Sequence, residues 1–193
     1  MSRIEEILFF WFGEARDDKD YYEERSSIWF GADPQFDQEI RDRFASDYQA
    51  AAERKLMHGQ DTPRGGLALI IVLDQFPRNM FRGEPRAFAT DSLAREVATS
   101  LIQAGFGQQL LPVERSFVYM PFMHSEDLED QQRSVALFRQ LAQEREYINS
   151  VAYALRHWEI IERFGRFPHR NAILDRLSTP EELAFLQQPD SSF

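Results

Sequence analysis

The sequence predicts an all-α protein whose 193 residues fold as one domain, residues 1–193. Apolar residues recur at helical spacing in most segments, and glycines follow several of these segments. Cap-plus-proline pairs mark helix starts at Asp33-Pro34, Thr62-Pro63 and Thr179-Pro180. With 43% hydrophobic residues the chain is long enough to bury a substantial core, and two tightly packed helical halves are the alternative to one domain.

Composition excludes several classes of partner. The 22 basic and 32 acidic residues give a net charge of 22 − 32 = −10, so nucleic acid and anionic membrane surfaces are repelled overall. The chain has no cysteine, which removes disulfides, thiolate nucleophiles and cysteine metal sites and favours a reducing compartment. No secretion leader or bilayer-spanning run is recognisable. We therefore expect a cytoplasmic protein with no nucleic-acid or membrane partner.

The start of the chain predicts one short helix followed by an acidic stretch. Residues 4–12 are too apolar for an exposed helix, so we expect burial on several sides and an end at Gly13. Residues 14–24 are acidic and predict a solvated segment, whose end Trp29 and Phe30 would anchor in the core.

The middle of the chain predicts the two helices that build the core. Asp33-Pro34 opens a long helix that Gly59 would close. Thr62-Pro63 starts the segment 67–76, whose apolar run could also be a buried strand; the start signal and the length favour a central helix. The long helix would face the core with Phe36, Ile40, Phe44, Tyr48, Ala51 and Leu56.

The second half of the chain predicts further helices. They cover residues 91–104, 112–120, from His124 to about 145, and 149–164, with a turn at 121–123 and a stop at Gly105. A last short helix begins with a capping box formed by Thr179 and Glu182.

Two similar polar segments stand where apolar helices are expected to end. Phe76-Pro77-Arg78-Asn79 follows the central helix, and Gly165-Arg166-Phe167-Pro168-His169-Arg170-Asn171 follows the segment 149–164. Proline restricts the residue before it, so each segment predicts a rigid corner that directs guanidinium, imidazole and amide groups. Either the two halves of the chain are weakly related, or the corners converge on one place; a shared structural corner explains the similarity equally well.

These segments also carry a resemblance to a known family. Residues 73–79 (LDQFPRN), 119–127 (YMPFMHSED) and 165–171 (GRFPHRN) resemble those of a largely bacterial family called domain of unknown function 924, as do 10–13 (FWFG) and 178–182 (STPEE). The resemblance covers almost the whole chain. It implies a tetratricopeptide-like array of about eight to nine helices, and it supplies no activity or catalytic residue.

Several enzyme templates are absent from the sequence. It has no glycine-rich phosphate loop, no cysteine pair for zinc deaminase chemistry beside His124, and no glycines flanking Ser125 for a nucleophile elbow. The spacing of His124, His157 and His169, with Glu126 or Asp74 as a further ligand, matches no known metal-binding pattern on a helix face, so we predict no metal and no cofactor.

The preferred hypothesis is a polar pocket for a small anionic molecule carrying phosphate or carboxylate. His124 or His169 would move a proton, with Glu126 or Asp127 orienting the imidazole and arginines stabilising negative charge. The predicted catalytic residues are His124, Glu126 and His169, and the predicted ligand-binding residues are Arg78, Asn79, Asp127, Arg166, Arg170 and Asn171.

The competing hypothesis is a helical module that binds a peptide. In it, the same motifs act as structural staples, and Arg78 and Arg166 are already paired with Asp74, Glu126 or Asp127. Exposed aromatic residues on a concave surface would favour this function.

Overall fold

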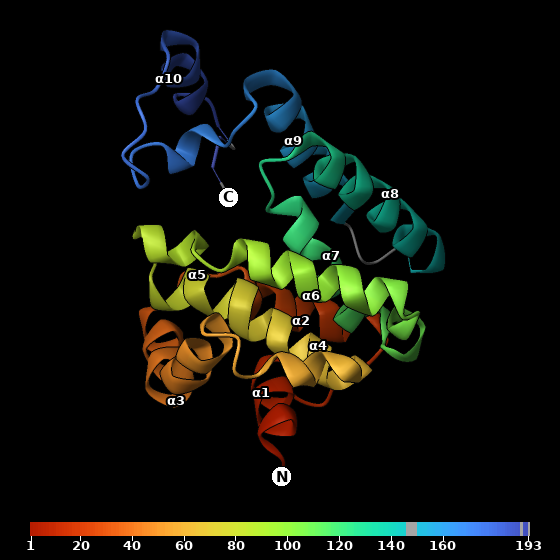
Figure 1. Cartoon of the computed structure of the whole chain (residues 1–193). Helices are drawn as coiled ribbons and strands as arrows, with labels where there is room; N and C mark the ends of the chain where they lie inside the picture. Colours follow the sequence, from red (N-terminus) through yellow and green to blue (C-terminus); the bar gives the residue numbers. More distant parts are fainter. Residues whose placement is uncertain (146–149, 190, 193) are drawn as a thin grey trace.

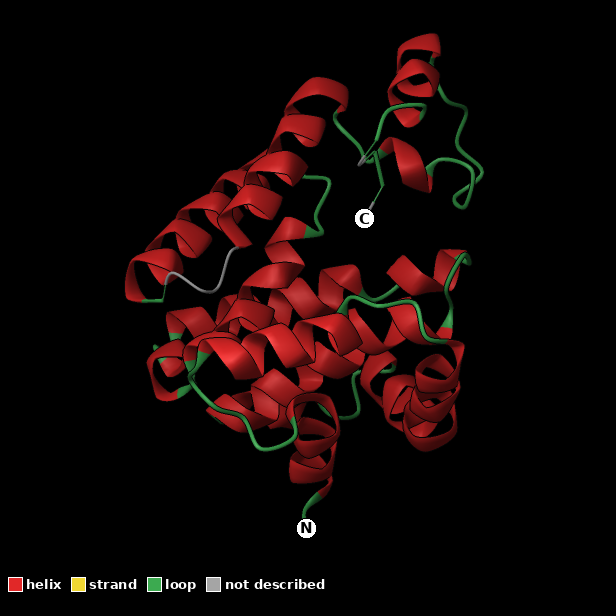
Figure 2. Cartoon of the chain, turned by 180° about the vertical axis from the view of Figure 1, so that it is seen from behind, coloured by secondary structure: helices red, strands yellow, loops and turns green. Residues whose placement is uncertain are grey.

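The computed structural model describes residues 1–145, 150–189 and 191–192, and it is helical throughout (Figure 2). No strand occurs among these residues, so the predicted all-α class is confirmed. No described helix is both long and apolar enough to cross a bilayer. The α-helices are α1 (Arg3–Phe12), α2 (Lys19–Trp29), α3 (Pro34–Ala52), α4 (Pro63–Ile70), α5 (Phe76–Met80), α6 (Asp91–Gln103), α7 (Pro112–Met123), α8 (Leu128–Glu144), α9 (Ser150–Phe164) and α10 (Pro180–Leu186).

Short turns of other helical types join these elements. They are the 3₁₀ turns η1 (Met57–Asp61), η3 (Pro85–Phe88), η4 (Phe106–Gln109) and η5 (Pro168–Arg170), and the π-helical turn η2 (Ile71–Gln75). Because η2 joins α4 to α5 without a break, these two labels form one rod and the described helices number nine, within the predicted eight to nine. A tetratricopeptide-like arrangement stays a prediction.

The predicted caps begin the helices as expected. The side chain of Asp33 accepts the backbone N–H of Gln35 at 2.9 Å, and Thr62 Oγ1 accepts that of Gly65 at 3.1 Å. The capping box of Thr179 and Glu182 opens α10. Just after the last residue of α9, Gly165 adopts φ 67°, a left-handed conformation that only glycine enters freely.

Two expected helix ends were wrong. Gly59 does not close the long helix, which ends at Ala52 just before Arg54 turns to φ 60°; Gly59 lies in η1 instead. The expected turn at 121–123 is part of α7, which continues through Pro121 to Met123.

Two expectations of burial are confirmed only in part, and one boundary is not described. α1 buries Ile7, Leu8, Trp11 and Phe12 but leaves Phe9 53% exposed. At the end of α2, Trp29 is buried, whereas Phe30 is 58% exposed although its ring stacks on Phe117 at 6.5 Å. The expected start of the helix at Asn149 lies outside the described residues.

The α4–η2–α5 rod occupies the middle of the main body, between α1, α3, α6 and α7 (Figure 1). Rings of Trp11 and Phe44 pack against this rod, and Phe76 on it lies 4.8 Å from Phe44 and 5.8 Å from Trp11 between centroids. Phe117 extends the cluster, with its centroid 5.9 Å from that of Trp11. Such aromatic contacts add to the free energy gained by burial. The body is therefore one aromatic core.

A second, smaller core holds the end of the chain together. Ile160, Ile161, Phe167 and Phe185 pack as a separate cluster. It joins the end of α9 to η5 and α10, and Figure 1 shows this part as a small unit beside α5 and α6. We call residues 160–189 the C-terminal lobe. The junction between lobe and body brings distant segments of the chain together.

The π turn explains how the central rod passes Pro77. Proline has no N–H, so Pro77 cannot donate to the carbonyl of Leu73 as a regular helix requires. That carbonyl instead accepts a hydrogen bond from Thr90 Oγ1 at 2.6 Å, and the Phe76 N–H donates to the carbonyl of Ile71. Contrary to expectation, the first Phe-Pro segment is therefore a continuation of the helix and not a corner.

We predict that Thr90→Val destabilises the protein by about 1–3 kcal/mol, because the buried Leu73 carbonyl loses its side-chain donor. The free energy of unfolding in urea measures this cost. Thr90→Ser, which keeps a hydroxyl, and Thr99→Val on the half-exposed side of α6 are the matched controls. Equal stability of the valine and serine variants at position 90 would contradict this role.

Candidate functional site at the junction of body and lobe

The carboxylate of Asp74 lies fully buried in the π turn and is surrounded by donors. Oδ1 contacts His124 Nδ1 at 2.8 Å and Arg78 Nη1 at 3.2 Å, and Oδ2 accepts from Gln75 Nε2 at 2.6 Å. Burial alone would raise the pKa of Asp74, but the charge of Arg78 and the hydrogen bond from His124 hold that pKa below its usual value. Asp74 is therefore a permanent anion and accepts hydrogen bonds only.

His124 follows the last residue of α7, and the partner of Nδ1 fixes its tautomer. Since an ionised Asp74 cannot donate, His124 Nδ1 carries the proton and Nε2 keeps its lone pair. Burial and then the charge of Arg78 lower the pKa of His124, so the ring is neutral near neutral pH. Its side chain is 15% exposed.

Arg78 makes three hydrogen bonds within the protein. Nη1 donates to the backbone carbonyl of Asp74 at 2.6 Å and to Asp91 Oδ1 at 2.9 Å, and Nη2 donates to Asp91 Oδ2 at 3.1 Å. This guanidinium therefore joins the π turn to the first residue of α6, and it balances two carboxylates with one charge.

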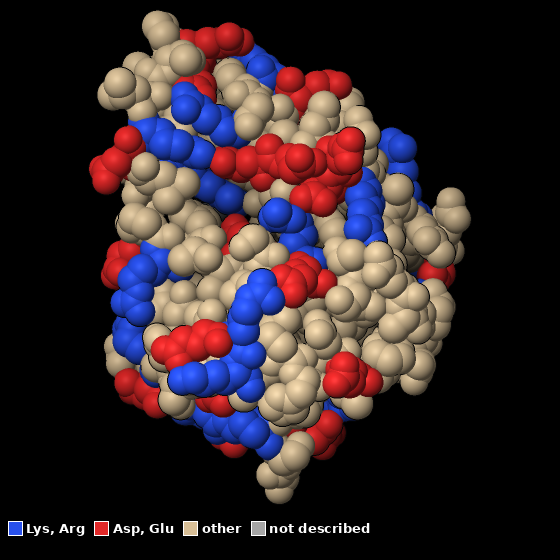
Figure 3. All heavy atoms as spheres, in the orientation of Figure 1, with Lys and Arg blue, Asp and Glu red and all other residues tan. Residues whose placement is uncertain are grey.

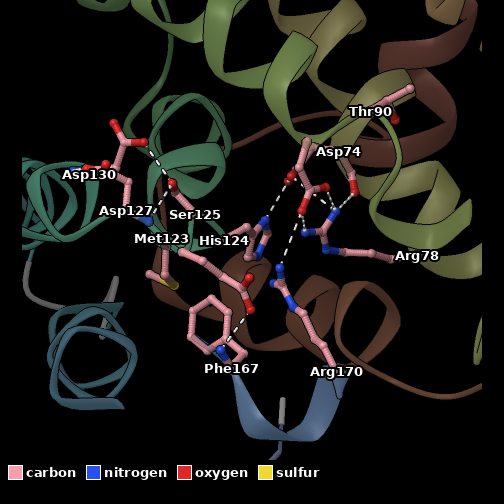
Figure 4. Close-up of polar contacts among 12 residues, drawn as sticks. Asp74, Arg78, Thr90, Met123, His124, Ser125, Asp127, Asp130, Phe167 and Arg170 are labelled. Atoms are coloured by element: carbon pink, nitrogen blue, oxygen red, sulfur yellow. Dashed lines mark hydrogen bonds and ion pairs between the residues drawn. The ribbon is translucent and has the colours of Figure 1, made fainter. Parts of the chain in front are cut away.

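Arg170 reaches the same acid from the lobe with far fewer partners. It is 6% exposed, and its guanidinium carbon lies 4.5 Å from the ring centroids of both Phe88 and Phe167. Its one ion pair among the described residues is a long one, 3.6 Å from Nη1 to Asp91 Oδ2, and its buried Nε has no hydrogen-bond partner. Burial and then the nearby Arg78 lower its pKa to about 10. Figure 4 shows Arg170 and Arg78 approaching one another from η5 and α5.

Two further histidines line the same junction. The His157 ring lies 6.4 Å from that of His124 and 5.5 Å from that of Phe167, and the His169 ring lies 5.6 Å from Phe167. His157 Nδ1 is 2.8 Å from the carbonyl of Tyr153, one turn earlier on α9. Burial lowers the pKa of His157 to about 3 and that of His169 to about 4, with the charge of Arg170 adding to both shifts. Both rings are therefore neutral near neutral pH.

Glu126 and Arg166 fasten the lobe. Glu126 Oε1 accepts the backbone N–H of Phe167 at 2.8 Å, and Arg176 donates to both of its oxygens at 2.7 and 2.9 Å. Arg166 donates to Glu182 at 2.6 and 2.8 Å, an acid that the sequence analysis assigned only to the cap of α10. These two ion pairs hold the lobe together, so Glu126 and Arg166 are not available to a ligand.

The remaining candidates have local partners. Asn171 donates from Nδ2 to Ser178 at 3.1 Å and accepts from Arg176 Nε at 3.0 Å, so it shapes the lobe. Asp127 caps α8 by accepting from the N–H of Glu129 at 2.8 Å. Asn79 donates to Asp37 at 2.7 Å, on the side of the rod that contacts α3.

The structure thus brings Arg78, His124 and Arg170 to one junction (Figure 4), with His169 beside them against Phe167. It leaves Asn79, Asp127, Arg166 and Asn171 in contacts of their own. The sequence analysis missed Asp91, which both Arg78 and Arg170 contact, because its place at a helix start already explains an acidic residue. No group of three or more potential metal ligands gathers anywhere in the described part of the chain.

We predict that the protein loses stability as the pH falls from about 7.5 to about 5. The unfolded chain binds protons on histidine below about pH 6.5, whereas folded His157, with a pKa of about 3, does not. The contribution to stability is therefore complete above the unfolded pKa and is lost as the pH falls. For His157 alone, the loss amounts to roughly 2 kcal/mol at about pH 5.

Urea unfolding at the two pH values tests this prediction. His157→Gln should reduce the loss of stability between them, while His58→Gln on the exposed turn η1 should leave it unchanged. An unaltered pH dependence in His157→Gln would mean that this ring is not neutral in the fold.

Comparisons with known proteins place the chain in a family. A family model described as "Bacterial protein of unknown function (DUF924)" matches residues 7–190. The chain is also similar to a solved structure described as a protein of unknown function, ATU0120 from Agrobacterium tumefaciens. The two share 40% sequence identity over 95% of this chain and 96% of that one, with a TM-score of 0.83. No curated protein matches the chain. The chain therefore belongs to the bacterial DUF924 family of proteins of unknown function.

Proposed function

We propose that the protein binds a small anionic metabolite of the cytoplasm, through a carboxylate or phosphate group, at the junction of body and lobe with Arg170 as the anchor. The observation that carries this proposal is the guanidinium of Arg170, which is buried between two rings yet has only a 3.6 Å ion pair and an Nε without a partner. A buried donor that is left without a hydrogen bond costs about 1–3 kcal/mol of stability, and a charged donor costs more.

The contrast with Arg78 supports a ligand role for Arg170. Both guanidiniums approach Asp91, but Arg78 already donates to both of its oxygens. Both oxygens of Asp91 therefore have a hydrogen-bond donor without Arg170, and the donors of Arg170 are available to another anion. A guanidinium fork matches the geometry of carboxylate and phosphate oxygens.

The surroundings favour a local site over attraction from a distance. Basic and acidic side chains lie next to one another over the face shown in Figure 3, where a band of acidic side chains borders a run of basic ones. An anion would be held by the short-range interactions of a desolvated arginine, whose strength grows as water is excluded.

The Asp74–His124 pair would supply the proton chemistry if the bound molecule is also turned over. The tautomer with a free Nε2 lone pair is that of a general base. His169 is the other candidate proton carrier. Glu126 is less suited to this role because Arg176 and the Phe167 N–H already occupy both of its oxygens. Hydrolysis and group transfer are equally compatible with this arrangement.

The second candidate function is peptide binding by a tetratricopeptide-like module. It is favoured by the pairing of Arg78 with Asp74 and Asp91 and of Arg166 with Glu182, as staples would be. Exposed apolar side chains of the lobe and of α9 also favour it, among them Leu177 at 91% and Tyr153 at 62% exposure.

Thermal unfolding with added phosphate, sulfate, acetate, citrate or a mixture of short peptides separates the two functions. An anion present at about 100 times its dissociation constant should stabilise the fold by about 2.7 kcal/mol, which raises Tm by about 5–10 °C. Arg170→Gln should abolish the increase.

The matched control is Arg163→Gln, which removes an exposed arginine of α9 paired with Glu181 and should keep the full response. Anion stabilisation that persists in Arg170→Gln would contradict the proposed site. Stabilisation by peptides alone would favour the peptide-binding module.

A further inference from the structure

We propose that the ligand group is a tetrahedral dianion of the phosphate type, and that His124 is its second contact, binding it as an imidazolium that takes up a proton as the ligand arrives. This inference rests on the proposed anion site and names both the ligand class and the residue that selects it.

The charges of the side chains at the junction sum to zero. Two cations, Arg78 and Arg170, stand against two anions, Asp74 and Asp91. Because the nearby imidazoles are neutral, an incoming dianion would leave the buried junction with two uncompensated negative charges. Uncompensated buried charge is costly, so binding must bring in a proton or be weak.

Several elements direct charged and titratable groups toward His124. The π turn supplies Asp74, α5 supplies Arg78 and α6 supplies Asp91. From the other side come His157 on α9, and Arg170 with its neighbour His169 on η5. Three imidazoles at the junction, those of His124, His157 and His169, are therefore candidate proton acceptors.

His124 is the imidazole prepared to receive the proton. Its Nδ1–H already donates to the buried carboxylate of Asp74, so a proton added at Nε2 creates an imidazolium with its counterion in place. His157 lacks this advantage because its Nδ1 faces a neutral backbone carbonyl. The new Nε2–H then becomes a charged donor to the ligand.

The direction of the coupling follows from the forces on His124. Burial and the charge of Arg78 lower its pKa in the free protein. A dianion beside the ring opposes both effects and raises that pKa, so binding at neutral pH takes up a proton. A monoanion exerts about half of this attraction, so the site selects phosphate over carboxylate.

Isothermal titration calorimetry with sulfate tests the proposal, because sulfate keeps both charges throughout the working pH range. Titrations in Tris and in triethanolamine, which differ in ionisation enthalpy, count the protons taken up. We expect between about a half and one proton for each sulfate near pH 7.5, and an affinity that falls by up to about tenfold for each pH unit above this value. Acetate should bind at least about tenfold more weakly.

Two variants assign the proton. His124→Gln keeps an amide donor for Asp74 but cannot titrate, so it should bind sulfate more weakly and with the same enthalpy in both buffers. His58→Gln on the exposed turn η1 should behave like the native protein. Comparing inorganic phosphate with phenyl phosphate then distinguishes a free ion from the ester of a larger molecule.

The outcomes separate this inference from the function on which it rests. Sulfate binding without proton uptake, or with the same uptake in His124→Gln, would overturn the inference and leave the anion site standing. If His124→Gln fails to fold, the buffer and pH dependence of the native protein still decide whether a proton is taken up, and binding without uptake overturns the inference. Failure of every anion to bind would overturn the site itself.

Discussion

The junction depends on the hydrogen bonds and ion pairs that the guanidinium of Arg78 makes with the π turn and with α6. This guanidinium donates to the backbone of the π turn and to Asp91 at the start of α6, while Asp74 in the same turn holds His124 at the end of α7. Three helices therefore meet around one buried charge network. Removing one member of such a network leaves the others buried without partners, which costs more than the pair contributes when complete.

The ion pair that joins the lobe to this network is longer than those within it. Glu126 latches the backbone at Phe167, but the guanidinium that enters the junction is that of Arg170, with one long ion pair and an unsatisfied Nε. Proteins rarely keep a buried donor unpaired without a reason. The same junction contains an oriented neutral histidine and two others with lowered pKa values. The proposed ligand site rests on this combination of an unsatisfied cation and an available base.

Much of the fold could be predicted from local signals, and the site only in part. Cap residues such as Asp33, Thr62 and Thr179 act on the next turn of chain, so sequence reveals them directly. The π turn before Pro77 could not be predicted, because the carbonyl it exposes is satisfied by Thr90 from a different segment. For the same reason the candidate residues were recognisable by type, whereas their partners Asp91, Arg176 and Glu182 depend on tertiary contacts.

A crystal structure of the protein with selenate, which has the shape and charge of sulfate and scatters anomalously, tests the central claim most directly. The account predicts an anomalous peak at the junction within hydrogen-bond distance of Arg170 Nε and on the Nε2 side of His124. Full occupancy of selenate elsewhere on the molecule, with Arg170 still paired only to Asp91, would contradict it.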